Sequence, residues 1–270
     1  MKNRKPIYII IPLIFAIGFY IYDHNFVEDK SPKVEVLENS NQQKSTVDLN
    51  PTSTTNQVVK HKYYSLSYHE KYEQAEWVAY ELKKEQITNQ NFKRPYFIYD
   101  SKVTTKSAYY KNYSNSGYDK GHLCPAGDMK FSKEAFNETF LTSNISPQNH
   151  DFNNGIWNRL EQKVRYWAQK HTKLFIVTGG VLSPNLKTIG SEHVAVPDFF
   201  YKIILDNSEP EIKAIAFLIP HEESEKGLYQ FVTSIDEIEE ITGIDFFSAL
   251  PDTLENNLEK SSSYAKWSLR

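Results

Sequence analysis

Four side chains with the chemistry to hydrolyse a phosphodiester lie close together in the sequence. They are Lys120, His122, Asn153 and Glu161. Such a hydrolysis needs a base that activates water, positive charge that offsets the charge developing on phosphorus, and a proton for the leaving oxygen. His122 suits the base because a neutral imidazole is available near pH 7, and Lys120 supplies a positive charge beside it. The sequence therefore predicts a catalytic site within residues 118–161.

Asn153 is the candidate metal ligand. Mg²⁺ prefers octahedral oxygen ligation, loses its water reluctantly and often accepts only one or two protein oxygens. One amide oxygen, with water at the other positions, meets that requirement for Mg²⁺, and Mn²⁺ is a possible substitute. Glu161, about two helical turns further on, is placed to hold the ion's water. Arg165, four residues later, either pairs with Glu161 or reaches a phosphate oxygen.

Each of these residues also has an ordinary structural explanation. A histidine in a turn is commonly solvated or bonded locally, and an asparagine before a helical pattern commonly caps the helix. Glu161 and Arg165 can form a simple surface ion pair. The lone cysteine, Cys124, excludes an intramolecular disulfide, and we expect a small buried side chain there, not a nucleophile. Only the joint spacing favours catalysis.

Charge is distributed unevenly along the chain. The formal net charge of -3 argues against a generally basic protein that coats nucleic acid. Residues 91–130 nevertheless carry seven Lys and Arg against three Asp and Glu, whereas residues 207–259 carry two against thirteen. A local basic patch with an acidic remainder suits a protein that grips a polyanion at one place. Two differently solvated surfaces would give the same distribution.

The sequence predicts three regions. Residues 1–26 hold basic side chains followed by an uncharged apolar run over 6–22, which favours an uncleaved membrane anchor, with a cleaved signal peptide as the alternative. The charge flanking this run places the remainder of the chain outside, so the catalytic domain is expected to be exported. Residues 27–62 contain no aromatic residue and are predicted to be a disordered linker. The globular domain is expected over 63–270.

Hydrophobic periodicity within this domain predicts a mixture of strands and helices. A helical pattern begins at Asn153, and a second helix ends at Gly243. Because strands and helices do not alternate regularly, the fold class is predicted to be α+β. The expected strands are 76–82, 174–178, 199–205 and 214–219.

Several ordered blocks resemble one known family. Gly117-Tyr118-Asp119-Lys120-Gly121-His122-Leu123 resembles the Asp-Arg-Gly-His signature of the DNA/RNA non-specific endonucleases, the ββα-metal group of the endonuclease G and Serratia types. The similarity covers roughly 63–250. The further matching blocks are 143–148, Asn153-x-Gly155-x-Trp157-x-x-Leu160-Glu161, 196–202 and 238–247.

The resemblance implies a fold and a set of roles. The fold is a central antiparallel β-sheet flanked by helices, in which a ββα-metal motif carries the catalytic residues. The implied roles are a general base at His122, the direct metal ligand at Asn153, a partner of metal-bound water at Glu161 and a phosphate contact at Arg165. Metal-bound water would protonate the leaving 3′ oxygen and so give 5′-phosphate ends.

The resemblance also bears on how three residues would contact the substrate. Arg94 is the expected counterpart of a family arginine, and Asn144 is expected to bind substrate. Lys120 departs from the family pattern, which usually has arginine there; lysine keeps the charge but loses the planar two-pronged grip on phosphate. Members of the family cut both DNA and RNA because they contact the backbone and not the bases.

The function predicted from the sequence is thus an exported, Mg²⁺-dependent endonuclease that cuts DNA and RNA. One alternative is a catalytically weak module that binds nucleic acid. Another is a phosphodiesterase that acts on small nucleotides. Closed circular DNA distinguishes the last case, because only an endonuclease can cut a substrate without ends.

Overall fold

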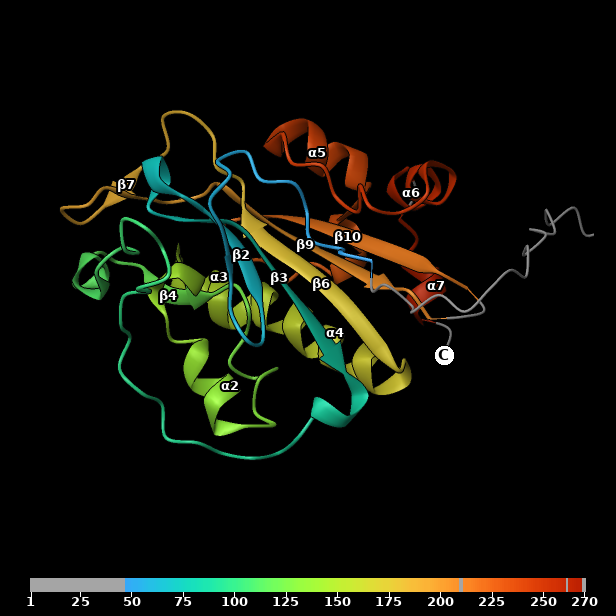
Figure 1. The fold of residues 1–270 in the computed structure, drawn as a ribbon, viewed down its shortest axis with the longest axis horizontal. Coiled ribbons are helices and arrows are strands. Elements are labelled where there is room, and N and C mark those ends of the chain that lie inside the picture. The colour runs from blue at the N-terminus through green and yellow to red at the C-terminus, as the bar shows by residue number, and fades with distance from the viewer. Residues whose placement is uncertain (1–46, 209–210, 261, 269–270) are drawn as a thin grey trace, which may run out of the picture. The chain divides into compact units, whose positions relative to one another are not determined.

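A seven-stranded antiparallel sheet forms the centre of the fold in the computed structural model, which describes residues 47–208, 211–260 and 262–268 (Figure 1). Every neighbouring pair of strands in this sheet is antiparallel. The predicted α+β class with a central antiparallel sheet is therefore confirmed. In spatial order the strands are β1 (Val58–Lys60), β2 (Ser65–His69), β3 (Gln74–Lys83), β6 (Lys173–Gly180), β9 (Phe199–Asp206), β10 (Lys213–Pro220) and β11 (Val232–Thr233).

Outside the central sheet, the described residues form two small hairpins, six α-helices and several short 3₁₀ helices. The hairpins are β4 (Asp119–His122) with β5 (Ile145–Gln148), and β7 (Thr188–Ile189) with β8 (Val194–Ala195). The helices are α2 (Lys133–Glu138), α3 (His150–Phe152), α4 (Asn158–Lys170), α5 (Ile235–Thr242), α6 (Asp252–Glu259) and α7 (Ala265–Ser268). No helix within the described ranges is long and apolar enough to cross a membrane.

Both faces of the central sheet are buried, because each is covered by helices. Side chains alternate along a strand, so Leu174 and Ile176 of β6 face the core on the α4 side, whereas Phe175 and Val177 face the opposite core. The opposite core also receives apolar side chains of α5 and α6. Figure 1 shows these two helices above the sheet and α4 below it. This arrangement explains why β6, β9 and β10 are mostly apolar along their length.

The compact unit begins earlier than predicted. It spans Val47 to Arg270, and β1 lies inside the stretch that the sequence assigns to a linker, 27–62, and pairs with β2. Leu49 is buried in the core beside α5 and α6, and the backbone oxygen of Thr52 accepts a hydrogen bond from Trp77 at 2.8 Å. Backbone pairing at a sheet edge needs no aromatic side chain, so an aromatic-free stretch can still be ordered. The predicted anchor, 1–26, lies outside the described residues.

The helix expected to begin at Asn153 begins at His150 instead. Asn149 is its cap: the side-chain oxygen accepts hydrogen bonds from the backbone N–H groups of Asp151 and Phe152. Asn153 opens a π-type turn, Asn153–Trp157, which joins α3 to α4 and is kinked at Gly155, where φ is -91° and ψ is -109°. Inserted π turns are frequent at functional sites, because they redirect side chains away from the regular helical positions. Asn153 is therefore not an N-cap; it is the C-cap of α3.

Candidate active site

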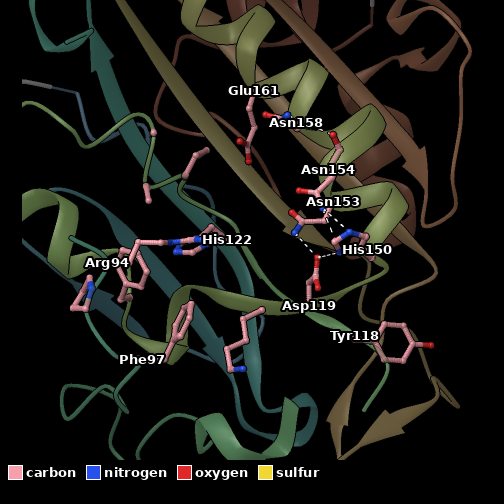
Figure 2. A pocket seen from close by; sticks show the side chains of 16 residues that line it. Arg94, Phe97, Tyr118, Asp119, His122, His150, Asn153, Asn154, Asn158 and Glu161 are labelled. Atoms are coloured by element: carbon pink, nitrogen blue, oxygen red, sulfur yellow. Dashed lines mark hydrogen bonds and ion pairs between the residues drawn. The ribbon is translucent and has the colours of Figure 1, made fainter. Parts of the chain in front are cut away.

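A cavity of about 660 Å³ lies between the β4–β5 hairpin and the helix that follows it. Its lining includes Lys120, His122, Asn153 and Glu161, the four side chains singled out in the sequence, together with Arg94. In Figure 2, Glu161 and Asn153 lie on one side of the cavity, and His122 with Arg94 lies on the other. The fold thus brings Arg94 and the four residues of the 118–161 segment to one concave surface.

His122 ends strand β4 on the same face as Lys120, since side chains two apart on a strand point the same way. Its ring packs against Phe97 and Phe140, with centroid distances of 5.7 and 5.0 Å. Burial, and then the charge of Arg94, lowers the pKa of His122 to about 3. Its Nε2 has no hydrogen-bond partner among the described residues. The imidazole is therefore neutral at pH 7, and its Nε2 is not engaged by another group of the described residues.

The amide of Asn153 is oriented by a carboxylate. Its Nδ2 donates a hydrogen bond to Oδ2 of Asp119 at 3.0 Å, and Nδ1 of His150 lies 3.0 Å from the same oxygen (Figure 2). Because the amide nitrogen faces Asp119, the amide oxygen is left for another partner. Asn154 also donates to the ring of His150, so all four side chains belong to one polar network.

The residues present fit a hard divalent cation. The oxygen donors that line the cavity include the Asn153 amide and the carboxylates of Asp119 and Glu161. Amide and carboxylate oxygens are the ligands that Mg²⁺ and Mn²⁺ prefer, and a cation there would retain several waters. No thiol lines the cavity, since Cys124 is fully buried as predicted and burial raises the pKa of its thiol. Soft-metal chemistry is thus disfavoured.

Glu161 reaches the cavity from α4 above a buried lysine. Burial raises the pKa of Glu161 to about 7, Lys202 opposes this rise, and Asp128 adds to it. Lys202 lies on β9, is fully buried, and places its Nζ 4.7 Å from the centre of the Trp157 ring. This Nζ has no hydrogen-bond partner within the described part of the chain. Its positive charge therefore favours the ionised form of Glu161.

Arg165 is engaged away from the cavity. Its Nη1 donates to Oδ1 of the buried Asp128 at 2.7 Å and lies 3.9 Å from Glu161. Asp128 also accepts a hydrogen bond from the hydroxyl of Tyr80 at 2.8 Å. The structure therefore places Arg165 as a support for the carboxylate beside it, and not among the residues that line the cavity. Its pairing with Glu161 agrees with one of the two roles expected from the sequence, and the phosphate contact stays a prediction.

Asn144 is also held away from the cavity. It is fully buried, and its side chain bonds both backbone polar groups of Cys124 as well as the carbonyl of Thr139, at distances of 2.8 to 3.0 Å. All the donors and one acceptor of the amide are thereby occupied. Asn144 therefore fixes the chain that follows His122, and the structure does not bring it to a position for binding substrate.

Two basic side chains do reach the cavity. Arg94 is exposed and lies over the ring of Phe140, with its guanidinium carbon 5.5 Å from the ring centre. Lys120 lies with its Nζ 5.7 Å from the ring centres of both Phe97 and Tyr113. The rings limit where each cation can move, so both charges are directed to the side of the cavity that holds His122.

Three residues of the site were missed in the sequence. Asp119 lies within the recognised motif, but no sequence pattern near it indicates its hydrogen bond to Asn153, which is 34 residues away. His150 precedes Asn153 by three residues, a spacing that places two helical side chains on one face and could have identified it. Lys202 is in an otherwise apolar strand, where one lysine at a fully buried position is itself a signal of function.

Named relatives of this chain are nucleases. The mitochondrial nuclease EXOG of Danio rerio is 35% identical over 202 residues, which cover 68% of this chain and 59% of that protein. A nuclease of Nostoc sp. is 30% identical over 227 residues, covering 77% of this chain and 80% of the relative. The human mitochondrial endonuclease G is 29% identical over 201 residues, covering 68% and 67%. The alignment thus spans little more than half of the EXOG protein and most of the Nostoc protein.

These comparisons overturn the predicted localisation. The sequence favoured an exported domain anchored in a membrane by residues 1–26, whereas the relatives from Danio rerio and Saccharomyces cerevisiae are named as mitochondrial nucleases. The predicted anchor itself lies outside the described residues. An apolar run behind basic residues is shared by several kinds of targeting segment, so it was a weak basis for the prediction. The membrane is accordingly withdrawn as a partner.

The fold agrees with that of a solved nuclease. A chain in the crystal structure of the EndoG/EndoGI complex superposes with a TM-score of 0.66 and 27% identity, covering 72% of this chain and 86% of the other. The sequence model of the DNA/RNA non-specific endonucleases matches residues 41–253. These matches confirm the resemblance seen in the motif blocks and the predicted enzyme class. This chain belongs to the DNA/RNA non-specific endonuclease family.

Proposed function

We propose that this protein is a metal-dependent endonuclease that hydrolyses phosphodiester bonds in both DNA and RNA. The observation that carries the proposal is the meeting of His122 and Asn153 across one cavity. His122 arrives on a hairpin strand and Asn153 on the helix that follows, which is the ββα arrangement expected from the motifs. The family assignment supports the nuclease activity at the level of class.

His122 is the proposed general base. Its neutral imidazole is able to take a proton from the attacking water, and the aromatic rings around it exclude competing solvent. Arg94 and Lys120 hold the phosphate on the same side, where their charges offset the negative charge that grows in the transition state.

Asn153 and Glu161 are the proposed holders of a divalent cation, with Mg²⁺ as the first choice and Mn²⁺ as a possible substitute. Asp119 fixes the amide so that its oxygen is directed away from the hydrogen bond. A bound cation would supply Lewis-acid stabilisation of the phosphoryl oxygens and acidify water. Arg94 and Lys120 would orient the phosphate of the substrate toward this cation.

The proposed substrate contacts explain why sugar and base identity would matter little. The cavity presents cations and a histidine, which are groups that contact phosphate. We therefore expect cleavage of single- and double-stranded nucleic acids with a strong dependence on salt, since each phosphate contact releases counterions.

The experiment is cleavage of closed circular plasmid and of RNA by the purified full chain, with Mg²⁺ and with EDTA. The proposal predicts cutting of both substrates in Mg²⁺ and none in EDTA. His193→Asn is a matched control for variants of His122, because His193 is exposed and has a positive φ of 57° that asparagine tolerates. Cleavage of small diesters with an intact plasmid would instead establish a small-molecule phosphodiesterase. Tight plasmid binding without cleavage in Mg²⁺ or in Mn²⁺ would establish a binding module.

A further inference from the structure

Five carboxylates converge on the face of the sheet opposite α4. They are Asp236 and Glu239 of α5, Asp245 of the following loop, and Glu255 and Glu259 of α6. They form two overlapping groups that share Glu259. In one, oxygens of Asp236, Glu239 and Glu259 lie within 4.8 Å of one another; in the other, oxygens of Asp245, Glu255 and Glu259 do so.

Glu259 separates this cluster from an ordinary acidic surface. The residue is only 8% exposed, and its Oε1 is buried without a hydrogen-bond partner among the described residues. An unpaired buried carboxylate is costly, because it has lost water and gained nothing in return. Glu259 therefore lacks a partner that its position requires.

The neighbouring groups increase this cost. Burial, and then Glu239, Glu255, Asp236 and Asp245, raise the pKa of Glu259 to about 8. The pKa values of Glu239 and Glu255 are raised as well. No ion pair recorded within the described ranges involves any of the five. The cluster thus repels itself, and a bound cation would remove the repulsion.

We propose that these carboxylates form a Ca²⁺ site centred on Glu259. Ca²⁺ takes six to eight oxygen ligands at about 2.3–2.6 Å in flexible geometry, so oxygens on opposite sides of the ion lie about 5 Å apart. The spacing of the carboxylates fits this range. Mg²⁺ requires shorter bonds and near-ideal octahedral geometry. The absence of thiol and imidazole ligands from both groups disfavours zinc and copper.

This site is separate from the catalytic cavity. α5 and α6 cover the core on one side of the sheet, whereas Glu161 belongs to α4 on the other side (Figure 1). The ion would join α5, the loop at Asp245 and α6, whose packing otherwise depends on side chains such as Ile238 and Leu258. Its role is to stabilise this layer and not to take part in phosphodiester cleavage.

Calorimetric titration with CaCl₂ tests the site in the full chain and in Asn153→Ala, which removes the proposed catalytic ligand. One Ca²⁺ is expected to bind to Asn153→Ala with a micromolar to millimolar Kd. Introducing Glu259→Gln into the Asn153→Ala variant should raise this Kd about tenfold or more. Asp236→Asn and Asp245→Asn alter exposed ligands and should weaken it without affecting folding. Glu240→Gln, an exposed acid of α5 outside both groups, is the matched control and should bind as before.

Thermal unfolding provides the second measurement. Saturating Ca²⁺ should raise the Tm of the wild-type chain and of Asn153→Ala by several degrees, but should not raise that of Glu259→Gln. In EDTA, Glu259→Gln should be at least as stable as wild type, because it removes a buried carboxyl group whose charged form has no partner. Its plasmid cleavage in Mg²⁺ should be unchanged. The absence of Ca²⁺ binding to Asn153→Ala, or equal binding and stabilisation in Glu259→Gln, would overturn the proposal.

Discussion

The side-chain amide of Asn153 is bonded to Asp119, with 3.0 Å between Nδ2 of the first and Oδ2 of the second. This bond joins strand β4 to the π turn and fixes which end of the amide faces the cavity. An unrestrained amide could rotate by half a turn and present its N–H₂ group to a cation, which would prevent ligation. Asp119 is therefore expected to act on the metal through Asn153.

Asp119→Ala should weaken activation by Mg²⁺, because the amide of Asn153 loses the bond that orients it. The concentration of Mg²⁺ for half-maximal cleavage should rise about 10- to 100-fold, while the rate at saturating Mg²⁺ falls less. Titrating Mg²⁺ in a plasmid-nicking assay measures both quantities. Asp151→Ala removes an exposed carboxylate from the neighbouring helix α3 and is the control. Equal behaviour of the two variants would refute the orienting role.

Lys202→Met should also weaken activation by Mg²⁺, since it removes a positive charge that favours the ionised form of Glu161. We expect an increase of about tenfold or more in the half-maximal Mg²⁺ concentration. Lys213→Met is a matched control, because Lys213 is a buried lysine on β10 that lies 5.0 Å from the ring of Trp267. If both variants lose thermal stability to the same degree and neither changes the Mg²⁺ requirement, Lys202 has only a structural role.

Arg94→Gln should shift the pH dependence of cleavage. After burial, the charge of Arg94 is the second cause that lowers the pKa of His122. Removing this charge makes the imidazole easier to protonate, so its pKa rises. A general base works only when neutral, and the acidic fall in kcat/KM should therefore occur at a higher pH. Lys93→Gln controls for the loss of one exposed charge. A fall at the same or a lower pH would exclude the coupling.

Lys120→Arg tests the phosphate clamp. Arginine should preserve or raise the rate, because its planar group can hold two phosphate oxygens where lysine holds one. Lys120→Ala should lower kcat/KM on both plasmid and RNA by about tenfold or more, as expected for loss of a charged contact. Steady-state rates on the two substrates provide the comparison. A large loss in Lys120→Arg would show that the packing between Phe97 and Tyr113 is specific for lysine.

The part of the site that the sequence predicted consists of residues on elements that are neighbours in the chain. One cavity holds His122, Asn153 and Glu161, because the hairpin and the helix that carry them follow each other in the chain. The motif blocks of these two elements are also close together in the sequence. Strands over 174–178 and 199–205 were found because strands with two buried faces are apolar throughout.

The remainder depends on contacts that have no local pattern. Arg165 has the spacing of a phosphate-binding residue, yet it pairs with Asp128, 37 residues earlier. Asn144 lies in a recognisable block but turns inward to bond the backbone of Cys124. Residues 27–62 lack aromatic residues, and β1 within them still pairs as an edge strand. Such cases are decided by tertiary partners, and neither composition nor periodicity reports them.

Chemical rescue of His122→Ala is the most direct test of the central claim, that His122 is the base of a metal-dependent nuclease. In saturating Mg²⁺, kcat on plasmid should fall about 10²- to 10⁴-fold. Added imidazole should restore part of the lost rate with the pH dependence of free imidazole, and should leave wild type and His193→Asn unchanged. A folded His122→Ala variant that cuts within a few-fold of wild type would contradict the account.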